Sequence, residues 1–223
     1  MGLSLLVKVR AAAIGMAMLI GAQSAAAATL QASVRDQHGK PVADGVVSAT
    51  PLDPKNAPHA KPPAVVDQVD KQFVAYVTPI NVGSMVKFPN SDKIRHQVYS
   101  FSAAKRFDLP LYAGTDAPPV LFDKPGVVVL GCNIHDWMIG YIYVSETPFF
   151  AKTGSAGTAS LEDVPAGDYL VKVWHPRMER TEEVTSRRVT LSAGTPVNLE
   201  WQLTLKPAFR IPRVSGAASP GYP

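Results

Sequence analysis

A strict alternation of apolar and polar residues over 197–205 is the feature that most constrains how this chain can fold. Every odd position of this segment is apolar and every even position is polar, so an extended strand would bury one side and expose the other. Residues 169–174 predict a second strand, and the apolar run 126–130 predicts one that is buried on both faces. No stretch shows a long helical period, and the short runs are separated by Gly, Pro, Asn and Asp. The sequence therefore predicts an all-β chain of sandwich or barrel type.

The N-terminus has the pattern of an export signal. Lys8 and Arg10 precede an apolar run over 11–22, and Ala26 and Ala28 supply a small-x-small cleavage pattern. The apolar run is shorter than the roughly 20 residues that a membrane span needs. We therefore expect residues 1–28 to be a signal peptide that is cleaved near Thr29, and the protein to be periplasmic with no membrane span.

The charge balance of the chain argues against polyanionic partners. Residues 1–28 contain two positive and no negative side chains, so their removal lowers the formal net charge from +4 to +2. A surplus this small does not favour nucleic acid or an anionic membrane as the main partner.

Proline-rich and glycine-rich segments divide the rest of the chain. Residues 51–63 contain five prolines and are expected to form a linker or a crossing loop. The segment 29–60 holds only two expected strands, which do not form a stable domain alone. We predict that it pairs with 148–206 in one discontinuous β-sandwich, into which a second domain, 64–147, is inserted. The Pro-, Gly-, Ser- and Ala-rich tail, 207–223, is expected to be disordered.

The chain's only cysteine lies in a short segment of potential metal ligands. Cys132, His135 and Met138 follow one another at three-residue steps directly after the apolar run 126–130, and His96 is a candidate fourth ligand from a distant strand. Two His, one Cys and a weak axial Met are the ligand set of blue-copper centres. Zinc is the other metal option, although structural zinc seldom binds a thioether. The non-metal alternative is a buried structural thiol, because free Cys often packs as a small apolar residue.

The middle of the chain resembles the cupredoxins, the plastocyanin and amicyanin group of small blue-copper proteins. The resemblance rests on Phe-Pro-Asn-x-Asp before His96 and on Gly-x-Val-x-Leu-Gly-Cys-x-x-His-x-x-Met from Gly126 to Met138; this Cys-to-Met spacing matches the short loop of amicyanin. It implies a Greek-key β-sandwich that holds one type 1 copper ion. The implied ligands are His96, Cys132, His135 and Met138.

Three positions beside the ligands depart from the pattern of that family. Gln97 stands where Asn is frequent, Asn133 where Ser or Thr is frequent, and Ile134 where Pro is frequent. Such neighbours orient the ligands and tune a metal site. The departures leave the ligand set intact but leave the reduction potential open.

The outer segments carry a second resemblance. Residues 34–47 and 157–169, with their Asp-Gln-His-Gly and Val-Pro-Ala-Gly-Asp turns, resemble carboxypeptidase regulatory-like domains. This implies a transthyretin- or Ig-like β-sandwich of a kind that often serves as a scaffold or an interaction unit. Together the two parts resemble exported bacterial proteins of the plastocyanin-like or methylamine-utilisation type.

Catalytic machinery is not evident in the sequence. Cys132 and His135 could be cast as a nucleophile and its base with Asp136 as the orienting group, but such pairs normally come from residues that are distant in sequence. No Gly-rich phosphate loop or paired-carboxylate motif is present. His38, His59 and His175 have no ligands clustered around them, and we expect them at turns or on the surface. The chain is therefore not expected to be an enzyme.

These features predict a periplasmic type 1 copper protein that carries single electrons between redox partner proteins and acts as a monomer. One alternative is a copper-binding or copper-delivery protein without redox turnover. The other is an exported scaffold module that binds no metal.

Overall fold

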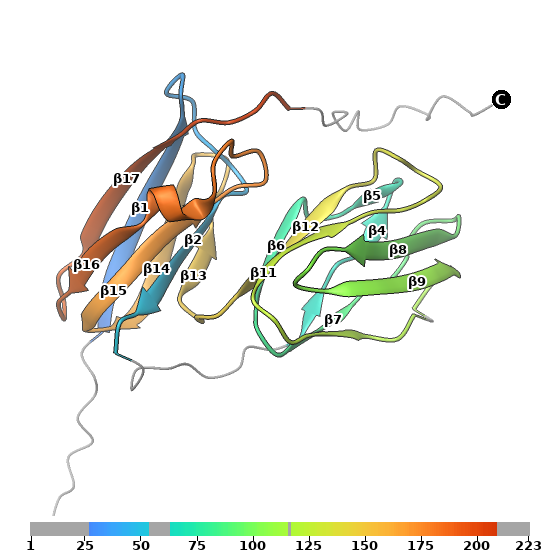
Figure 1. Cartoon of the computed structure of the whole chain (residues 1–223), viewed down its shortest axis with the longest axis horizontal. Coiled ribbons are helices and arrows are strands. Elements are labelled where there is room, and N and C mark those ends of the chain that lie inside the picture. Colours follow the sequence, from blue (N-terminus) through green and yellow to red (C-terminus); the bar gives the residue numbers. More distant parts are fainter. Residues whose placement is uncertain (1–26, 54–62, 116, 209–223) are drawn as a thin grey trace, which may run out of the picture.

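The computed structural model describes residues 27–53, 63–115 and 117–208, and nearly all of its regular structure is β (Figure 1). The prediction of an all-β chain is confirmed; the one helical element in the described ranges is the 3-10 helix η2 (Glu182–Thr185). Strands fall into two groups, one from both ends of the chain and one from its middle. The end strands are β1 (Ala27–Asp36), β2 (Val46–Pro51), β13 (Phe150–Lys152), β14 (Thr158–Pro165), β15 (Gly167–Trp174), β16 (Arg187–Leu191) and β17 (Val197–Leu203).

The first two strands pair only with strands from the end of the chain. β1 lies antiparallel to β14 and parallel to β17, and β2 lies between β13 and β15, with β16 at the edge beyond β15. The result is two facing sheets, of three and four strands. If the middle segment is inserted into the outer sandwich, the first two strands must pair with the C-terminal strands, as they do here. The domain boundaries themselves remain a prediction.

The core of this outer sandwich follows the alternation read from the sequence. Trp201 and Leu203 of β17 are buried, while Glu200 and Gln202, which alternate with them, are exposed. Tyr169, Val171 and Val173 of β15 are completely buried, and they meet the β1 and β17 side chains between the sheets. The predicted strands at 169–174 and 197–205 are therefore confirmed, with the second ending at Leu203.

The middle strands form a second pair of layers around their own core. The sheet β11-β12-β6 is extended by β8 and β9, because Tyr99 of β8 and Gly131 exchange two backbone hydrogen bonds of 3.0 and 3.1 Å. The sheet β10-β7-β3 and the hairpin β4-β5 share one buried core with it, to which β5, β7, β10, β11 and β12 all contribute. This arrangement is consistent with the expected cupredoxin sandwich. The strands are β3 (Ala64–Val65), β4 (Gln68–Val69), β5 (Gln72–Phe73), β6 (Val77–Asn81), β7 (Ser84–Lys87), β8 (His96–Phe101), β9 (Arg106–Tyr112), β10 (Val120–Phe122), β11 (Gly126–Leu130) and β12 (Gly140–Ser145).

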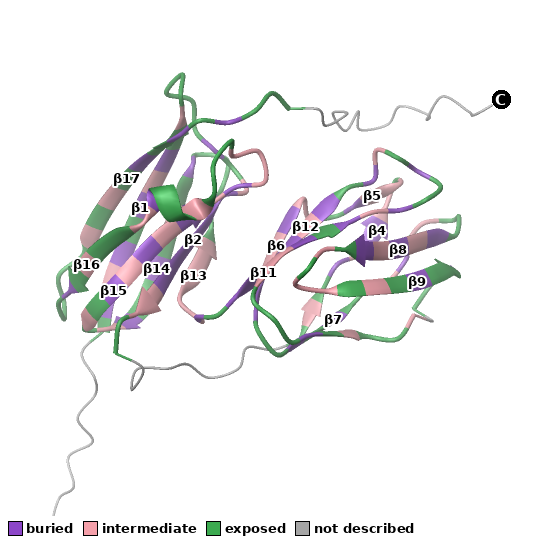
Figure 2. Cartoon of the chain, viewed as in Figure 1, coloured by how far each residue is buried: buried purple, intermediate pink, exposed green. Residues whose placement is uncertain are grey.

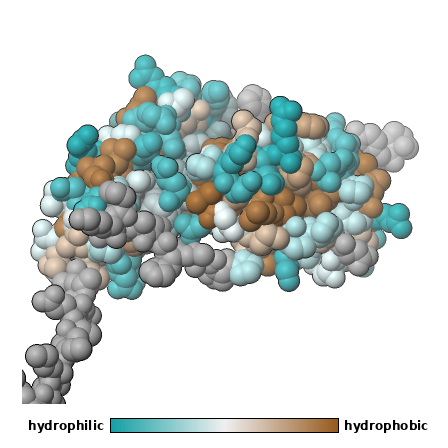
Figure 3. Space-filling model, turned by 60° about the horizontal axis from the view of Figure 1, so that its bottom comes forward, coloured by the Kyte–Doolittle hydropathy of each residue, from teal (hydrophilic) through white to brown (hydrophobic). Residues whose placement is uncertain are grey.

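One sequence expectation fails in this central half. β11 is not buried on both faces: Val128 and Leu130 are buried, whereas Val129 is 42% exposed. The outer face of the β10-β7 pair is also partly apolar, because Met85 and Leu121 are register partners and both are exposed. Figure 2 shows the mixed burial of these strands, and Figure 3 shows apolar surface on this half of the molecule.

Aromatic side chains join the two sandwiches. Trp174 of β15 packs against Tyr141 and Tyr143 of β12, with ring centroids 6.0 and 5.4 Å apart. Val46 and Val77 are fully buried in the same cluster. The Tyr143 hydroxyl donates a 2.9 Å hydrogen bond to Glu182 of η2. The strand β12, which follows the segment of predicted ligands, is thus held against the outer sandwich.

The predicted terminal segments lie mostly outside the described residues. Residues 1–26 of the signal peptide and 209–223 of the tail belong to the ranges that are not described, as does most of the 51–63 linker. Ala27 and Ala28, which cleavage at Thr29 would remove, are the first residues of β1, and Ala28 is buried. No helix within the described residues is long and apolar enough to cross a membrane.

His175 lies at the turn after β15, as one of the two expected placements had it, but it is buried and not on the surface. The residue follows β15 and is 4% exposed, and its Nδ1 atom accepts a hydrogen bond from the Arg177 amide. Burial, with a smaller contribution from the Arg177 charge, lowers the pKa of His175 to about 4. The imidazole is therefore neutral in the folded protein at neutral pH.

Acidification should destabilise the protein through His175. The unfolded imidazole takes up its proton near pH 6.5 and the folded one near pH 4, so the free energy of unfolding should fall as the pH is lowered between these values, by about 3 kcal/mol at most. In urea unfolding at pH 7 and pH 4.5, the loss should be smaller in His175→Gln than in the parent protein. An unchanged pH dependence in His175→Gln would contradict the assignment.

Candidate metal centre

Two neighbouring strands bring the predicted ligands together. His96 is the first residue of β8, and Cys132 comes two residues after the end of β11. The segment from Cys132 to Met138 turns back into β12, the antiparallel partner of β11. Because β8 is bonded to Gly131 through Tyr99, His96 reaches the same end of the sandwich as this turn.

Three ligand atoms converge in a buried cluster. The Cys132 Sγ atom lies 3.9 Å from the Nδ1 atom of His96 and 3.9 Å from the Nδ1 atom of His135. The two imidazole rings have centroids 4.9 Å apart. His96 is 0% exposed, Cys132 3% and His135 8%. Within the described residues, this is the one group of His, Cys or acidic side chains that could hold a metal ion.

Met138 is also buried, at 1% exposure, and belongs to the same apolar core as Cys132. Its amide donates a 2.8 Å hydrogen bond to the His135 carbonyl, which closes a turn over residues 135–138. The backbone thus places the methionine directly behind the turn that carries His135. Its role as an axial ligand remains a prediction.

Asp92 sets the protonation of His96. Its Oδ2 atom lies 2.7 Å from the Nε2 atom of His96, so a carboxylate there requires the imidazole proton on Nε2 and leaves the Nδ1 lone pair facing Cys132. Burial opposes ionisation, but hydrogen bonds from the Lys71 amide, from His96 and from the Asp70 amide outweigh it and lower the pKa of Asp92. Asp92 lies four residues before His96 in the sequence, and this spacing is the local signal that points to the contact.

Two of the residues that differ from the cupredoxin pattern are hydrogen-bonded to each other. The Asn133 side-chain amide donates a 2.8 Å hydrogen bond to the Gln97 carbonyl oxygen, and the Gln97 amide donates one of 2.6 Å to Asp108. Gln97 follows His96 and Asn133 follows Cys132, so the pair ties the two ligand-bearing segments to each other. Gln97 is longer than the Asn that is frequent at its position in cupredoxins, and its side chain finds a hydrogen-bond partner in the amide of Asn133.

A glycine stands at each end of the ligand segment because aromatic rings occupy the space of a side chain. A Cβ atom on Gly131 would lie 2.7 Å from Cζ of Tyr99, and one on Gly140 would lie 3.0 Å from the Phe73 ring. Separations this short would force the rings to move. The close packing of these rings holds the segment in place from both sides.

His135 lies nearer the surface than the other two candidate ligands. Ile134 and Ile139, in the same segment, are 47% and 45% exposed, and the Trp137 ring centroid lies 5.2 Å from that of His135. Burial first, and then the His96 and Lys71 charges, lower the pKa of His135. A neutral imidazole is the form that binds metal.

The other histidines lie away from this centre. His38 is exposed at the turn after β1, and His175 is buried in the outer sandwich. His59 lies outside the described residues. Of the described histidines, the structure therefore brings together only the two that the sequence analysis selected.

Comparisons with known proteins return partial structural similarity. No protein-family model and no curated protein matches the sequence. A copper-containing nitrite reductase from Thermus scotoductus is 28% identical, with a TM-score of 0.36 over 44% of this chain and 25% of that one, so the chain spans about a quarter of the enzyme's length. A purple cupredoxin from Nitrosopumilus maritimus is 22% identical, with a TM-score of 0.33 over 37% of this chain and 99% of that one. The Cu(I) form of an amicyanin variant is 22% identical, with a TM-score of 0.34 over 44% and 99%.

Replacing Asp92 by Asn should weaken metal binding. The variant keeps the size of the side chain but removes the charge that holds the His96 proton on Nε2, and losing such a partner typically costs about 10- to 100-fold in affinity. Affinity for Cu(I) can be measured by competition with a chromogenic chelator. Asp123→Asn, which removes an exposed partner of Lys105, is the matched control. Equal affinities in the two variants would rule out this role for Asp92.

Proposed function

We propose that the protein is a type 1 copper protein that carries single electrons between redox partner proteins. The observation that carries the proposal is the buried group of Cys132, His96 and His135, in which both Nδ1 atoms lie 3.9 Å from the thiol sulfur. Met138 is the proposed axial ligand. One copper ion is the proposed cofactor.

The donor chemistry of the cluster fits copper. Atoms 3.9 Å apart can share one ion, because metal–nitrogen and metal–sulfur bonds in proteins are roughly 2.0–2.3 Å long. A thiolate with two imidazoles and a nearby thioether is the set that blue-copper sites use. Bound copper would take up and release one electron at a time. Asp92 would keep the Nδ1 atom of His96 available, and the Gln97–Asn133 pair would hold the ligand segment in register.

Electron transfer is favoured over catalysis by the burial of the ligands. None of the three clustered residues is more than 8% exposed, so they leave little room for a substrate to reach an ion among them. His135, beside exposed Ile134 and Ile139, is the ligand closest to the surface and hence the proposed point of electron exit. The turn is held by flanking glycines and rings, and a stiff cage limits rearrangement between oxidation states.

We also infer export and a two-domain organisation. A signal peptide over 1–28 would deliver the protein to the periplasm, where we expect it to act as a monomer. Residues 64–147 would form the copper domain, inserted between 29–60 and 148–206 of a carboxypeptidase regulatory-like sandwich. The pairing of β1 and β2 with the C-terminal strands supports this division.

The visible absorption and EPR spectra after Cu(II) addition test the proposal. A type 1 site should give an intense thiolate-to-copper band and narrow copper hyperfine splitting, and reversible reduction should follow. Cys132→Ser should abolish the blue band and leave the far-UV circular dichroism unchanged, because the residue is small and only the sulfur is lost. A blue spectrum in Cys132→Ser would refute the assignment. A colourless parent protein that still binds copper would indicate copper storage or delivery instead.

Met138→Leu tests the axial position. Leucine conserves the volume and adds no donor, so copper binding should persist while the reduction potential rises, because an apolar contact favours the less charged Cu(I). Cyclic voltammetry of the copper-loaded protein measures this shift. Met85→Leu, on the exposed face of β7, should not change the potential. If the potential of Met138→Leu matched that of the parent, Met138 would not be a ligand.

A further inference from the structure

The outer sandwich has an open side between two edge strands. β17 is hydrogen-bonded to β1 alone, and β16 to β15 alone. After β17 ends, residues 204–206 pair with 177–179, but within the described residues no strand covers the outer edge of Val197–Leu203. An uncovered edge presents unpaired backbone groups that can accept a further strand.

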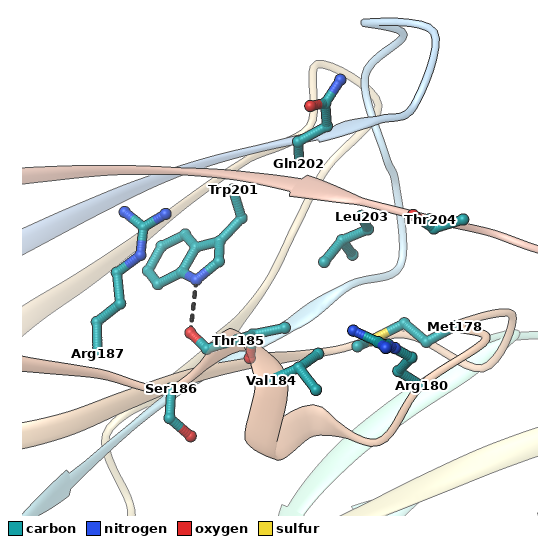
Figure 4. A pocket seen from close by; sticks show the side chains of 10 residues that line it. All are labelled: Met178, Arg180, Val184, Thr185, Ser186, Arg187, Trp201, Gln202, Leu203 and Thr204. Atoms are coloured by element: carbon teal, nitrogen blue, oxygen red, sulfur yellow. Dashed lines mark hydrogen bonds between the residues drawn. The ribbon is translucent and has the colours of Figure 1, made fainter.

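Two cavities lie along this open side and meet at the same residues. One has a volume of about 310 Å³ and the other about 320 Å³, and Arg187, Trp201 and Gln202 line both. Figure 4 shows the first, with Trp201 and Leu203 of β17 on one side and Val184 and Arg180 facing them. Together the cavities form a groove that follows β17, which we call the β17 groove.

Arginines give the β17 groove a positive charge. Arg180, Arg187 and Arg35 line it, against a single carboxylate, Glu200. Among the described residues, none of these three guanidinium groups forms an ion pair. The groove therefore has unused capacity to bind carboxylates, which guanidinium groups can hold by two parallel hydrogen bonds.

Arg187 is held in place at the centre of the groove. Its register partner on β15 is Val171, which is fully buried, so Arg187 stands on the core-facing side of β16. Its guanidinium carbon lies 4.7 Å from the Trp201 ring, whose Nε1 atom donates to the Thr185 carbonyl. Arg188, the next residue, points to the opposite face of the sheet.

We propose that the β17 groove binds an extended acidic segment of a partner protein, which adds as a strand to the free edge of β17. Main-chain hydrogen bonds would supply affinity, and side chains at alternate positions would supply specificity. Carboxylates on every second residue would face Arg180 and Arg187. This inference does not depend on the metal centre, and it assigns the outer sandwich a docking role.

The test uses a fluorescein-labelled peptide of seven residues, the length of β17, in which glutamate and valine alternate. Fluorescence anisotropy with the full protein should show saturable binding, and the lysine–valine counterpart should bind at least about tenfold more weakly. The double variant Arg180→Gln/Arg187→Gln should weaken binding of the glutamate peptide by at least about tenfold, because both exposed guanidinium groups would lose water on binding, and arginines that become buried in an interface tend to dominate its affinity. Arg188→Gln is the matched control and should bind like the parent.

Backbone pairing is tested separately. Hydrogen exchange with the peptide bound should slow at amides of Val197–Leu203, and N-methylation of every second peptide amide should abolish binding. Three results would overturn the proposal: no binding of the glutamate peptide at about 1 mM, equal affinity for the glutamate and lysine peptides, or an equal loss of affinity in Arg188→Gln and in the double variant. Dimers in sedimentation that the double variant disrupts would assign the groove to a second copy instead. A tenfold gain in peptide affinity on deletion of residues 209–223 would assign it to the chain's own end.

Discussion

The pairing of Tyr99 with Gly131 is the contact on which the rest of the centre depends. Two backbone hydrogen bonds join β8 to the end of β11, and through them a histidine 36 residues away from the cysteine reaches the same cluster. Gly131 is required there because the Tyr99 ring occupies the place of a Cβ atom. The sheet thus acts as the frame of the site, and the ligand turn is attached to it at both ends.

Around that frame, polar contacts orient the candidate ligands. Asp92 holds the His96 proton on the nitrogen that faces away from the cluster, and Asn133 binds Gln97 across the two ligand-bearing segments. Burial and nearby positive charge lower the pKa of His135 and favour the neutral ring. These contacts hold the candidate donor atoms together in one buried group.

Short-range patterns were the reliable part of the sequence analysis. The alternation over 197–205 predicted its strand, since the period of side-chain orientation is a property of the extended backbone. The ligand types and their spacing led to His96, Cys132 and His135, which the structure brings together. His175 and Val129 were misjudged because their exposure depends on what a distant part of the chain covers. Asp92 was missed although it lies only four residues before His96. The contact of Gln97 with Asn133 could not be foreseen, because it joins residues 36 positions apart and leaves no local pattern.

By itself, the sequence determined the fold class, the likeness of the middle segment to cupredoxins and the candidate ligands, because periodicity and residue chemistry are local. Only the tertiary structure decided that β1 and β2 complete a sheet with strands more than a hundred residues later. It alone decided the contact of Trp174 with β12 and the open edge of β17 with its arginines. The physical reason is that strand pairing and burial depend on neighbours in space, and these are set by the packing of the whole chain.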